Sequence, residues 1–201
     1  PFLGVTGLAA VLILLQPDLG TAVALTGTVF IMLFCAGTSL ATLSLVGMGG
    51  LAAVSVAICL EPYRLQRFLA FLDPWKDPQG SGFHIIQSLY AIGSGGLFGM
   101  GLGQGKQKFL YLPEQHTDFI FAVIAEELGF IGATLVIVLF LIFIWRGLRI
   151  ALYAPDTFAS LLATGITAGV GLQALINIGV VTGTLPVTGI PLPFISSGGT
   201  A

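Results

Sequence analysis

Four carboxylates crowd into one stretch of this chain, residues 112–127. They are Glu114, Asp118, Glu126 and Glu127, and they lie where a polar segment passes into an apolar helix. Only 8% of the chain is charged, against about 25% of an average soluble domain. Asp118 and Glu126 share the i, i+4, i+8 row of the expected helix, with Glu126 about 12 Å further along its axis. We interpret this stretch as the chemical centre of the protein.

Asp118 stands at the water end of that helix, beside a polar loop. A carboxylate in this position could act as a general base and take a proton from a hydroxyl group. It could equally be an N-cap that satisfies free backbone N–H groups at the helix start. Thr117 could cap the helix as well, so Asp118 is not required for that task. The residues alone leave both interpretations open.

Glu126 and Glu127 fall inside an apolar span, where ionisable residues are costly and by default have a functional or paired role. Gln173 and Asn177 lie four residues apart in a later span, so both amides share one helix face. The alternative for the two glutamates is burial against arginine or against these amides. We group all four as intramembrane polar residues.

Two lysines precede the carboxylate stretch. Lys106 and Lys108 follow a glycine-rich run and could hold a diphosphate as point charges, or could simply be solvated loop residues. Gly105-Lys106 does not form a P-loop, because that motif needs glycine at Met100 and serine or threonine at Gln107. Nucleotide binding is therefore not expected.

Three further polar residues have two interpretations each. Arg64, with Arg67 three residues on, could clamp phosphate or anchor an amphipathic interfacial helix among lipid headgroups. His116 could orient Asp118 or contact substrate, although a lone loop histidine more often does neither. Asp18 could line the same cavity as Asp118, but a cap on the helix that follows it is the simpler interpretation.

The elements that must position these residues are membrane helices. Hydrophobic residues make up 56% of the chain and the mean hydropathy is +1.02, so we predict an all-α, polytopic transmembrane helical bundle. We expect residues 1–201 to be a single transmembrane domain and a fragment of a larger membrane protein. The expected spans cover about 2–15, 22–36, 40–60, 119–145 and 158–181, with another starting near 200, and a long loop covers 61–117.

The long loop should contain short helices. Tyr63–Leu69 has the pattern of an interfacial helix, and His84–Ile92 reads as a short helix of mixed polarity. Gly93–Gly105 holds seven glycines and should have a flexible backbone. Gly165 and Gly169 form a small-xxx-small pair in the last complete span, which suits close helix packing.

Other functional classes find no support in the residues. Cys35 and Cys59 lie in apolar runs and read as small buried hydrophobes, not as a disulfide or metal pair. The two histidines have no Cys or carboxylate at ligand spacing, so we expect no metal motif. The net charge of −2 gives no argument for nucleic acid, and none is expected as a partner.

Charge does not decide the orientation in the membrane. The long loop holds five of the seven basic residues, which would place it in the cytosol, but it approaches the length at which the positive-inside rule loses force. Arg146 and Arg149 would suit a cytosolic connection on the opposite side. The residues alone leave the orientation open.

Three separated motifs carry a family resemblance. They are Gln16-Pro17-Asp18-Leu19-Gly20-Thr21, Leu112-Pro113-Glu114-Gln115-His116-Thr117-Asp118-Phe119-Ile120-Phe121 and Pro191-Leu192-Pro193-Phe194-Ile195-Ser196-Ser197-Gly198-Gly199. Their order and spacing resemble the SEDS family, the FtsW/RodA/SpoVE group of bacterial proteins, over the whole chain. Three further segments are more similar to the FtsW/SpoVE branch: Tyr63-Arg64, Pro74-Trp75-Lys76-Asp77-Pro78 and Gly80-Ser81-Gly82. Ser197 departs from the family, which often has an aromatic residue there.

The resemblance implies an activity and a location. It implies a peptidoglycan glycosyltransferase that polymerises lipid II into glycan strands for the septum of cell division or sporulation. It places the protein in the bacterial cytoplasmic (inner) membrane, with the long loop and the active site on the extracellular face. The catalytic aspartate of the family falls on Asp118, the base of an inverting displacement. Substrate contacts are expected from Lys106, Lys108, Arg64, Glu114, His116 and Ser196.

Partners follow from the same resemblance. Lipid II and the nascent glycan strand would be the substrates, and a class B penicillin-binding protein transpeptidase and division proteins would be the partners. The resemblance implies no certain cofactor; a divalent cation (Mg²⁺ or Mn²⁺) could share the charge of the diphosphate, but the sequence shows no ligand set for one. A lipid II flippase or transporter is the second hypothesis, because polar loops and intramembrane carboxylates also suit a transport cavity. A scaffold for the division machinery ranks third.

Overall fold

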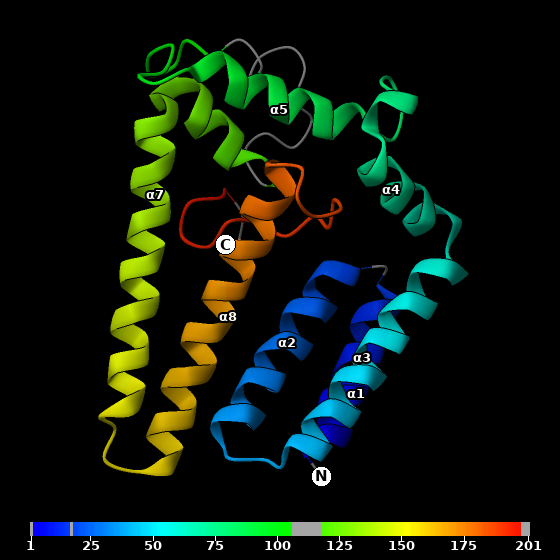
Figure 1. The fold of residues 1–201 in the computed structure, drawn as a ribbon, viewed down its shortest axis with the longest axis vertical. Coiled ribbons are helices and arrows are strands. Elements are labelled where there is room, and N and C mark those ends of the chain that lie inside the picture. The colour runs from blue at the N-terminus through cyan, green and yellow to red at the C-terminus, as the bar shows by residue number, and fades with distance from the viewer. Residues whose placement is uncertain (1, 17, 106–117, 198–201) are drawn as a thin grey trace. The chain divides into compact units, whose positions relative to one another are not determined.

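The computed structural model of the protein describes residues 2–16, 18–105 and 118–197. Within these ranges every regular element is a helix and no strand occurs (Figure 1). The predicted all-α class is therefore confirmed. The chain divides into two compact units, one of residues 1–61 and 141–172 and the other of residues 62–140 and 173–201. The boundaries fall inside two long helices, so each of these helices contributes to both units.

The first unit is built from five helical segments. They are α1 (Phe2–Leu15), α2 (Leu19–Cys35), α3 (Leu40–Leu60), the second part of α7 (Ile120–Leu152) and the first part of α8 (Thr157–Val181). Among the described residues, α3, α7 and α8 are long and apolar enough to cross a membrane, whereas α1 and α2 are apolar but shorter. Helices thus occur over all five expected spans; that the chain is one transmembrane domain stays a prediction.

The starts of α2 and α3 follow from local sequence. Asp18 caps α2, because its Oδ1 accepts a hydrogen bond from Thr21 N at 2.9 Å. Ser39 caps α3 in the same way, with Thr42 N donating to its Oγ at 3.3 Å. These are the short polar side chains that satisfy the free N–H groups of a first helical turn. The capping interpretation of Asp18 is confirmed.

Glycines bring α8 close to α2. A Cβ added at Gly165 would lie 2.9 Å from Met32 Sδ, and one added at Gly169 would lie 3.7 Å from Thr28 Oγ1. At Gly165 a side chain would have to displace Met32, and at Gly169 an added Cβ would be in van der Waals contact with Thr28, so the pair lies at a close helix contact, as expected for a small-xxx-small pair. The predicted packing role of this pair is confirmed.

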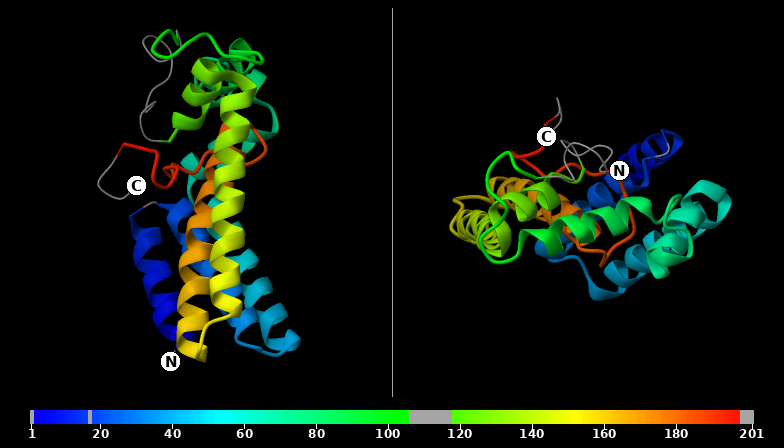
Figure 2. Two further views of the ribbon diagram at one scale, coloured as in Figure 1. Left: turned by 90° about the vertical axis from the view of Figure 1, so that its left-hand side faces the viewer. Right: turned by 90° about the horizontal axis from the view of Figure 1, so that it is seen from above.

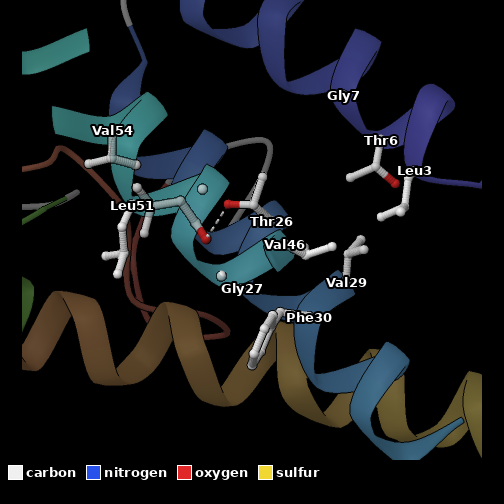
Figure 3. A pocket seen from close by; sticks show the side chains of 13 residues that line it. Leu3, Thr6, Gly7, Thr26, Gly27, Val29, Phe30, Val46, Leu51 and Val54 are labelled. Atoms are coloured by element: carbon white, nitrogen blue, oxygen red, sulfur yellow. Dashed lines mark hydrogen bonds between the residues drawn. The ribbon is translucent and has the colours of Figure 1, made fainter. Parts of the chain in front are cut away.

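An apolar cavity of about 390 Å³ lies between α1, α2 and α3 (Figure 3). Each helix contributes glycine to its wall: Gly7 from α1, Gly27 from α2, and Gly47 and Gly50 from α3. Thr26 also lines it, but the Thr26 hydroxyl donates to Ala22 O at 2.7 Å and so serves its own helix.

The two cysteines of the first unit lie at helix ends. Cys35 and Cys59 are both exposed. The prediction that they are buried is wrong, because each lies in the last turn of its helix.

The second unit holds the long loop and the ends of α7 and α8. Its elements are α4 (Pro62–Leu72), the 3-10 turn η1 (Pro74–Lys76), α5 (Phe83–Gly95), the first part of α7, the end of α8 and the loop that follows it. The core of the unit is supplied by Ile85, Ile86, Ala91, Phe119, Phe121, Ala122, Val180, Val181, Ile190 and Leu192. Ser88 Oγ, fully buried, donates to Val181 O at 3.0 Å and so ties α5 to the end of α8.

Helix α7 is bent sharply within the second unit (Figure 1 and Figure 2). Gly129 has φ 69° and ψ −167°, a non-helical conformation that separates a short first segment, 120–128, from a long second one. The sequence predicts one continuous span here, and that prediction is wrong. The second segment alone exceeds the roughly 20 residues that a bilayer requires, so the first segment is free to serve another purpose.

The bend is bridged by the glycine-rich segment after α5. Met100 N and Gly101 N donate to Glu126 O and Glu127 O, at 3.0 Å and 3.1 Å. In return, Phe130 N donates to Gly96 O at 2.8 Å, and Ile131 N donates to Leu97 O at 3.3 Å. The backbone groups exposed by the break are thereby paired, as buried helix ends require.

The glycines permit this close approach. A Cβ at Gly99 would collide with Glu127 O, and one at Gly95 would collide with Ala125 O. Gly96, Gly99 and Gly101 also have positive φ, which glycine adopts without steric cost. The glycine content predicts a flexible backbone, whereas in the structure these glycines allow residues 95–101 to pack closely against α7.

Candidate active site

Asp118 lies just before the first turn of α7. The hydrogen-bond ladder of the helix begins at Phe119 O, which accepts from Ala122 N at 3.0 Å and from Val123 N at 3.4 Å. Asp118 therefore lies just outside the helix, half-buried, while Phe119 beside it is 2% exposed. The buried Phe119 side chain holds the backbone at this point, and so it also limits where the backbone of Asp118 can lie.

Asn177, near the end of α8, holds the backbone of Asp118. Its Nδ2 donates to Asp118 O at 2.7 Å and to Ile190 O at 2.7 Å. The side chain is 1% exposed, and its bond to Ile190 O is buried, so the loss of that hydrogen bond would be costly. One amide thus connects the start of α7, the end of α8 and the following loop.

The loop after α8 forms the surroundings of the Asp118 carboxylate. Gly189 has φ 76°, and a Cβ added there would lie 3.5 Å from Asp118 Oδ2. Glycine is required for the backbone conformation, and it leaves the carboxylate beside bare backbone. Ile190 and Leu192, at 4% and 0% exposure, anchor the loop in the core.

Ser196 fastens the far end of this loop. Its Oγ accepts from Leu192 N at 2.7 Å, and its own N donates to Leu192 O at 3.0 Å. Between these two residues, Phe194 has φ 65°, a left-handed backbone conformation that is strained for a residue with a side chain. Ser196 therefore has a structural task in the loop; the predicted contact with substrate stays a prediction.

His84 of α5 stacks on Phe119. The two rings are 5.8 Å apart between centroids and 10° from parallel. Burial lowers the pKa of His84, and the nearby Arg67 guanidinium lowers it further. Sequence reasoning missed this residue, because no motif or spacing connects α5 to the start of α7.

Glu126 lies two turns beyond Asp118, at the end of the first segment of α7. It is 1% exposed, and Ala122 one turn earlier is 0% exposed, so this row of the helix faces the core. Gly105 packs against it, since a Cβ there would lie 2.9 Å from Glu126 Oε2 and 3.4 Å from Glu127 Cγ. The sequence finds these two glutamates but not the helix break directly after them.

The remaining predicted residues are distributed as follows. Arg64 is half-buried in α4, and Gln173 is half-buried in α8, one turn before Asn177. Lys106, Lys108, Glu114 and His116 lie outside the described residues, so their predicted roles stay predictions. The structure thus brings together Asp118 and Asn177 among the predicted site residues, and adds Gly189 and His84.

Metal-type side chains do not cluster in the described ranges. Within 2–16, 18–105 and 118–197, no group of three or more His, Cys, Asp or Glu side chains is placed to hold a metal ion. The predicted divalent cation stays a prediction.

The whole chain, residues 1–201, matches the sequence model of the FtsW/RodA/SpoVE family, which is described as "Cell cycle protein". It is 55% identical over its full length to stage V sporulation protein E of Bacillus subtilis, covering 55% of that protein. It is 49% identical over its full length to the probable peptidoglycan glycosyltransferase FtsW of Trichlorobacter lovleyi, covering 53% of it. The chain thus spans about half the length of the curated relatives it matches.

Solved structures agree with the fold. One, described as "Structural coordination of polymerization and crosslinking by a peptidoglycan synthase complex", has a TM-score of 0.75 and 38% identity, covering 96% of this chain and 54% of the other. The rod shape determining protein RodA of Thermus thermophilus has a TM-score of 0.61 and 31% identity, covering 98% of this chain and 50% of RodA. Both likenesses extend over nearly the whole of this chain.

Proposed function

Because the chain belongs to the FtsW/RodA/SpoVE family, we propose that it is part of a peptidoglycan glycosyltransferase that polymerises lipid II, with Asp118 as the general base. The names of its relatives support a role in cell wall synthesis. The observation that carries the assignment of the base is the anchoring of Asp118. Its backbone is held from another helix, and its carboxylate lies beside Gly189, where no side chain stands between them.

The proposed reaction is a single inverting displacement. The hydroxyl of the acceptor sugar attacks the anomeric carbon of the donor as the bond to the diphosphate breaks. Asp118 takes the hydroxyl proton, and undecaprenyl diphosphate leaves with the bonding electron pair. One base suffices if the leaving group is stabilised electrostatically.

We propose that cations of the long loop stabilise the leaving group. Lys106, Lys108 and Arg64 are the candidates, since lysine acts as a point charge on phosphate and arginine as a fork. A Mg²⁺ or Mn²⁺ ion could share this charge. Glu114, His116 and Ser196 complete the proposed substrate contacts.

The protein is a multi-pass membrane protein by its helices and its family. We propose the bacterial cytoplasmic membrane as its location, with the active site on the extracellular face, where glycan strands are built. A class B penicillin-binding protein that cross-links the strands is the proposed partner. The similarity to a peptidoglycan synthase complex that coordinates polymerisation and crosslinking supports this partner.

The test is glycan polymerisation from lipid II in detergent, by the full-length parent protein with its partner. Asp118→Asn keeps the shape of the side chain but cannot accept the proton, so we expect activity to fall by about 100-fold or more. Asp18→Asn is the matched control: asparagine caps a helix about as well as aspartate, so activity should stay within about two-fold. Both variants must remain folded and bound to the partner.

Undiminished polymer from Asp118→Asn would reject this assignment and direct the search for the base to Glu114 or Glu126. Detergent removes the two leaflets, so a flippase has nothing to cross under these conditions. If active wild-type preparations made no polymer but moved lipid II across vesicles, the flippase would replace the enzyme. If the wild type neither made polymer nor moved lipid II, while Asp118→Asn still supported assembly of the division machinery, the scaffold would be favoured.

A further inference from the structure

Asn177 takes no part in the proposed proton transfer, although it binds the backbone of the candidate base and the backbone of the loop beside it. It lies on α8, 59 residues beyond Asp118. Its side chain is 1% exposed, so it does not serve as a surface polar residue. Both of its hydrogen bonds go to backbone carbonyls and neither goes to a side chain. A polar residue that only links two helices would bond to one neighbouring helix, whereas Asn177 bonds to the start of α7 and to the loop after α8.

The orientation of the amide is fixed by its partners. Both Asp118 O and Ile190 O are acceptors, so only the NH₂ group of Asn177 can face them. An exchange of the oxygen and nitrogen would place an acceptor against two acceptors. The two 2.7 Å contacts therefore define one geometry, and no other rotation of the amide keeps them both.

The two carbonyls belong to the base itself and to the loop beside its carboxylate. The helical ladder of α7 starts at Phe119 O, and Asp118 O, one residue earlier, is tied to α8 by Asn177. Ile190 O belongs to the residue directly after Gly189, the residue that faces Asp118 Oδ2. One side chain therefore links the backbone of the base to the backbone of the loop beside it.

We infer that Asn177 is a positioning residue, which aims the Asp118 carboxylate at the acceptor hydroxyl by holding Asp118 O and Ile190 O together. This inference rests on the proposed function, because it assumes that Asp118 takes the proton. A displacement of about 1 Å at a reacting group can cost about 100-fold in rate. The amide would therefore affect the chemical step more than substrate binding.

The test varies the length of the side chain while keeping its chemistry. Asn177→Gln retains the donor group but adds one methylene, and Asn177→Ser is shorter and cannot clash. For both we expect kcat in lipid II polymerisation to fall by about 10- to 100-fold, with KM within about two-fold of wild type. The measurements use the full-length protein with its partner, at a temperature where each variant is folded.

Ser88→Ala is the matched control. Ser88 also makes buried hydrogen bonds to backbone carbonyls, but these belong to Ile85, at 2.8 Å, and Val181, at 3.0 Å, rather than to Asp118 or Ile190. The variant should lower the unfolding temperature, because a neutral buried hydrogen bond contributes about 1 kcal/mol to stability, and leave kcat within about two-fold of wild type.

Three results would overturn the inference. One is a folded Asn177 variant with wild-type kcat. The second is a rise in KM at unchanged kcat, since that would mark a binding role. The third is an equal loss of kcat in Ser88→Ala, which would mean that any loosening of this unit slows the reaction. Asp118→Asn is measured in parallel, and full activity in that variant would instead reject the proposed function itself.

Discussion

Asp18 and Asp118 both stand directly before an apolar helix, yet different parts of the chain hold them. Asp18 is held by its own helix: its Oδ1 accepts from Thr21 N at 2.9 Å and its O accepts from Ala22 N at 3.4 Å. Asp118 is held through its backbone by Asn177, a residue 59 positions away. One aspartate is thus bonded to its own helix, and the other is bonded to a residue of a different helix.

The surroundings of the two helix starts extend this difference. Around Asp118, α5 contributes the His84 ring on Phe119, and the loop after α8 contributes Gly189. The first segment of α7 is also closed at its far end, by the glycine-rich segment that pairs with Glu126 O and Glu127 O. A helix that only crosses the membrane needs none of this support. Contacts from other segments thus fix the short first segment of α7 at both of its ends.

The strongest way to break this contrast is to remove the bend. Gly129→Ala forces a side chain into a positive φ and against Gly99 N, and Gly99→Ala places a Cβ on Glu127 O. We expect each to destabilise the protein by more than about 3 kcal/mol or to prevent folding. Thermal unfolding of the purified protein in detergent, together with its yield, measures the effect.

Gly93→Ala is the control for these variants. Gly93 lies within α5, and a Cβ there would meet nothing within 4 Å. Alanine favours a helix over glycine by about 0.8–1.0 kcal/mol, so this variant should be as stable as the wild type or more so. An unchanged unfolding temperature in Gly129→Ala would show that α7 has no such bend.

The second prediction concerns the locally fixed aspartate. Asp18→Ala removes the cap of α2 and should cost about 1 kcal/mol of stability, whereas Asp18→Asn should cost only a few tenths. Glycan polymerisation should be unaffected in both, in contrast to the loss expected for Asp118→Asn. If Asp18→Ala abolished polymerisation while the protein stayed folded, Asp18 would belong to the site after all, and the contrast between the two aspartates would fail.

Sequence reasoning succeeded where a feature depends on neighbours in the chain. The cap at Asp18, the packing glycines Gly165 and Gly169 and the helices of the expected spans are all encoded within a few residues. The bend at Gly129 was missed, because a lone glycine inside an apolar helix usually only lowers its stability. What turns it into a break is the segment around Gly99, which pairs with the exposed backbone groups.

The candidate site shows the same division. Asp118 could be found from its position before an apolar helix, and Asn177 from the cost of an amide in a membrane span. That the two meet, and that Gly189 lies beside the carboxylate, depends on the course of the chain through α8 and the loop after it. His84 gave no local signal of its role, because its partner Phe119 lies 35 positions further along.

The smallest expected effect probes that ring contact through pH. Burial, and then Arg67, holds the pKa of His84 below 6.5 in the folded protein, whereas the unfolded chain titrates near 6.5. Between these two pKa values the unfolded state binds more protons than the folded state. The contribution of a neutral His84 to the free energy of unfolding is therefore fully present above pH 6.5 and is lost as the pH falls through the folded pKa. His84→Phe keeps a ring on Phe119 but cannot titrate. Its unfolding temperature should therefore fall less than that of the wild type between neutral and mildly acidic pH. Parallel curves for the two proteins would mean that the imidazole is not held neutral against Phe119.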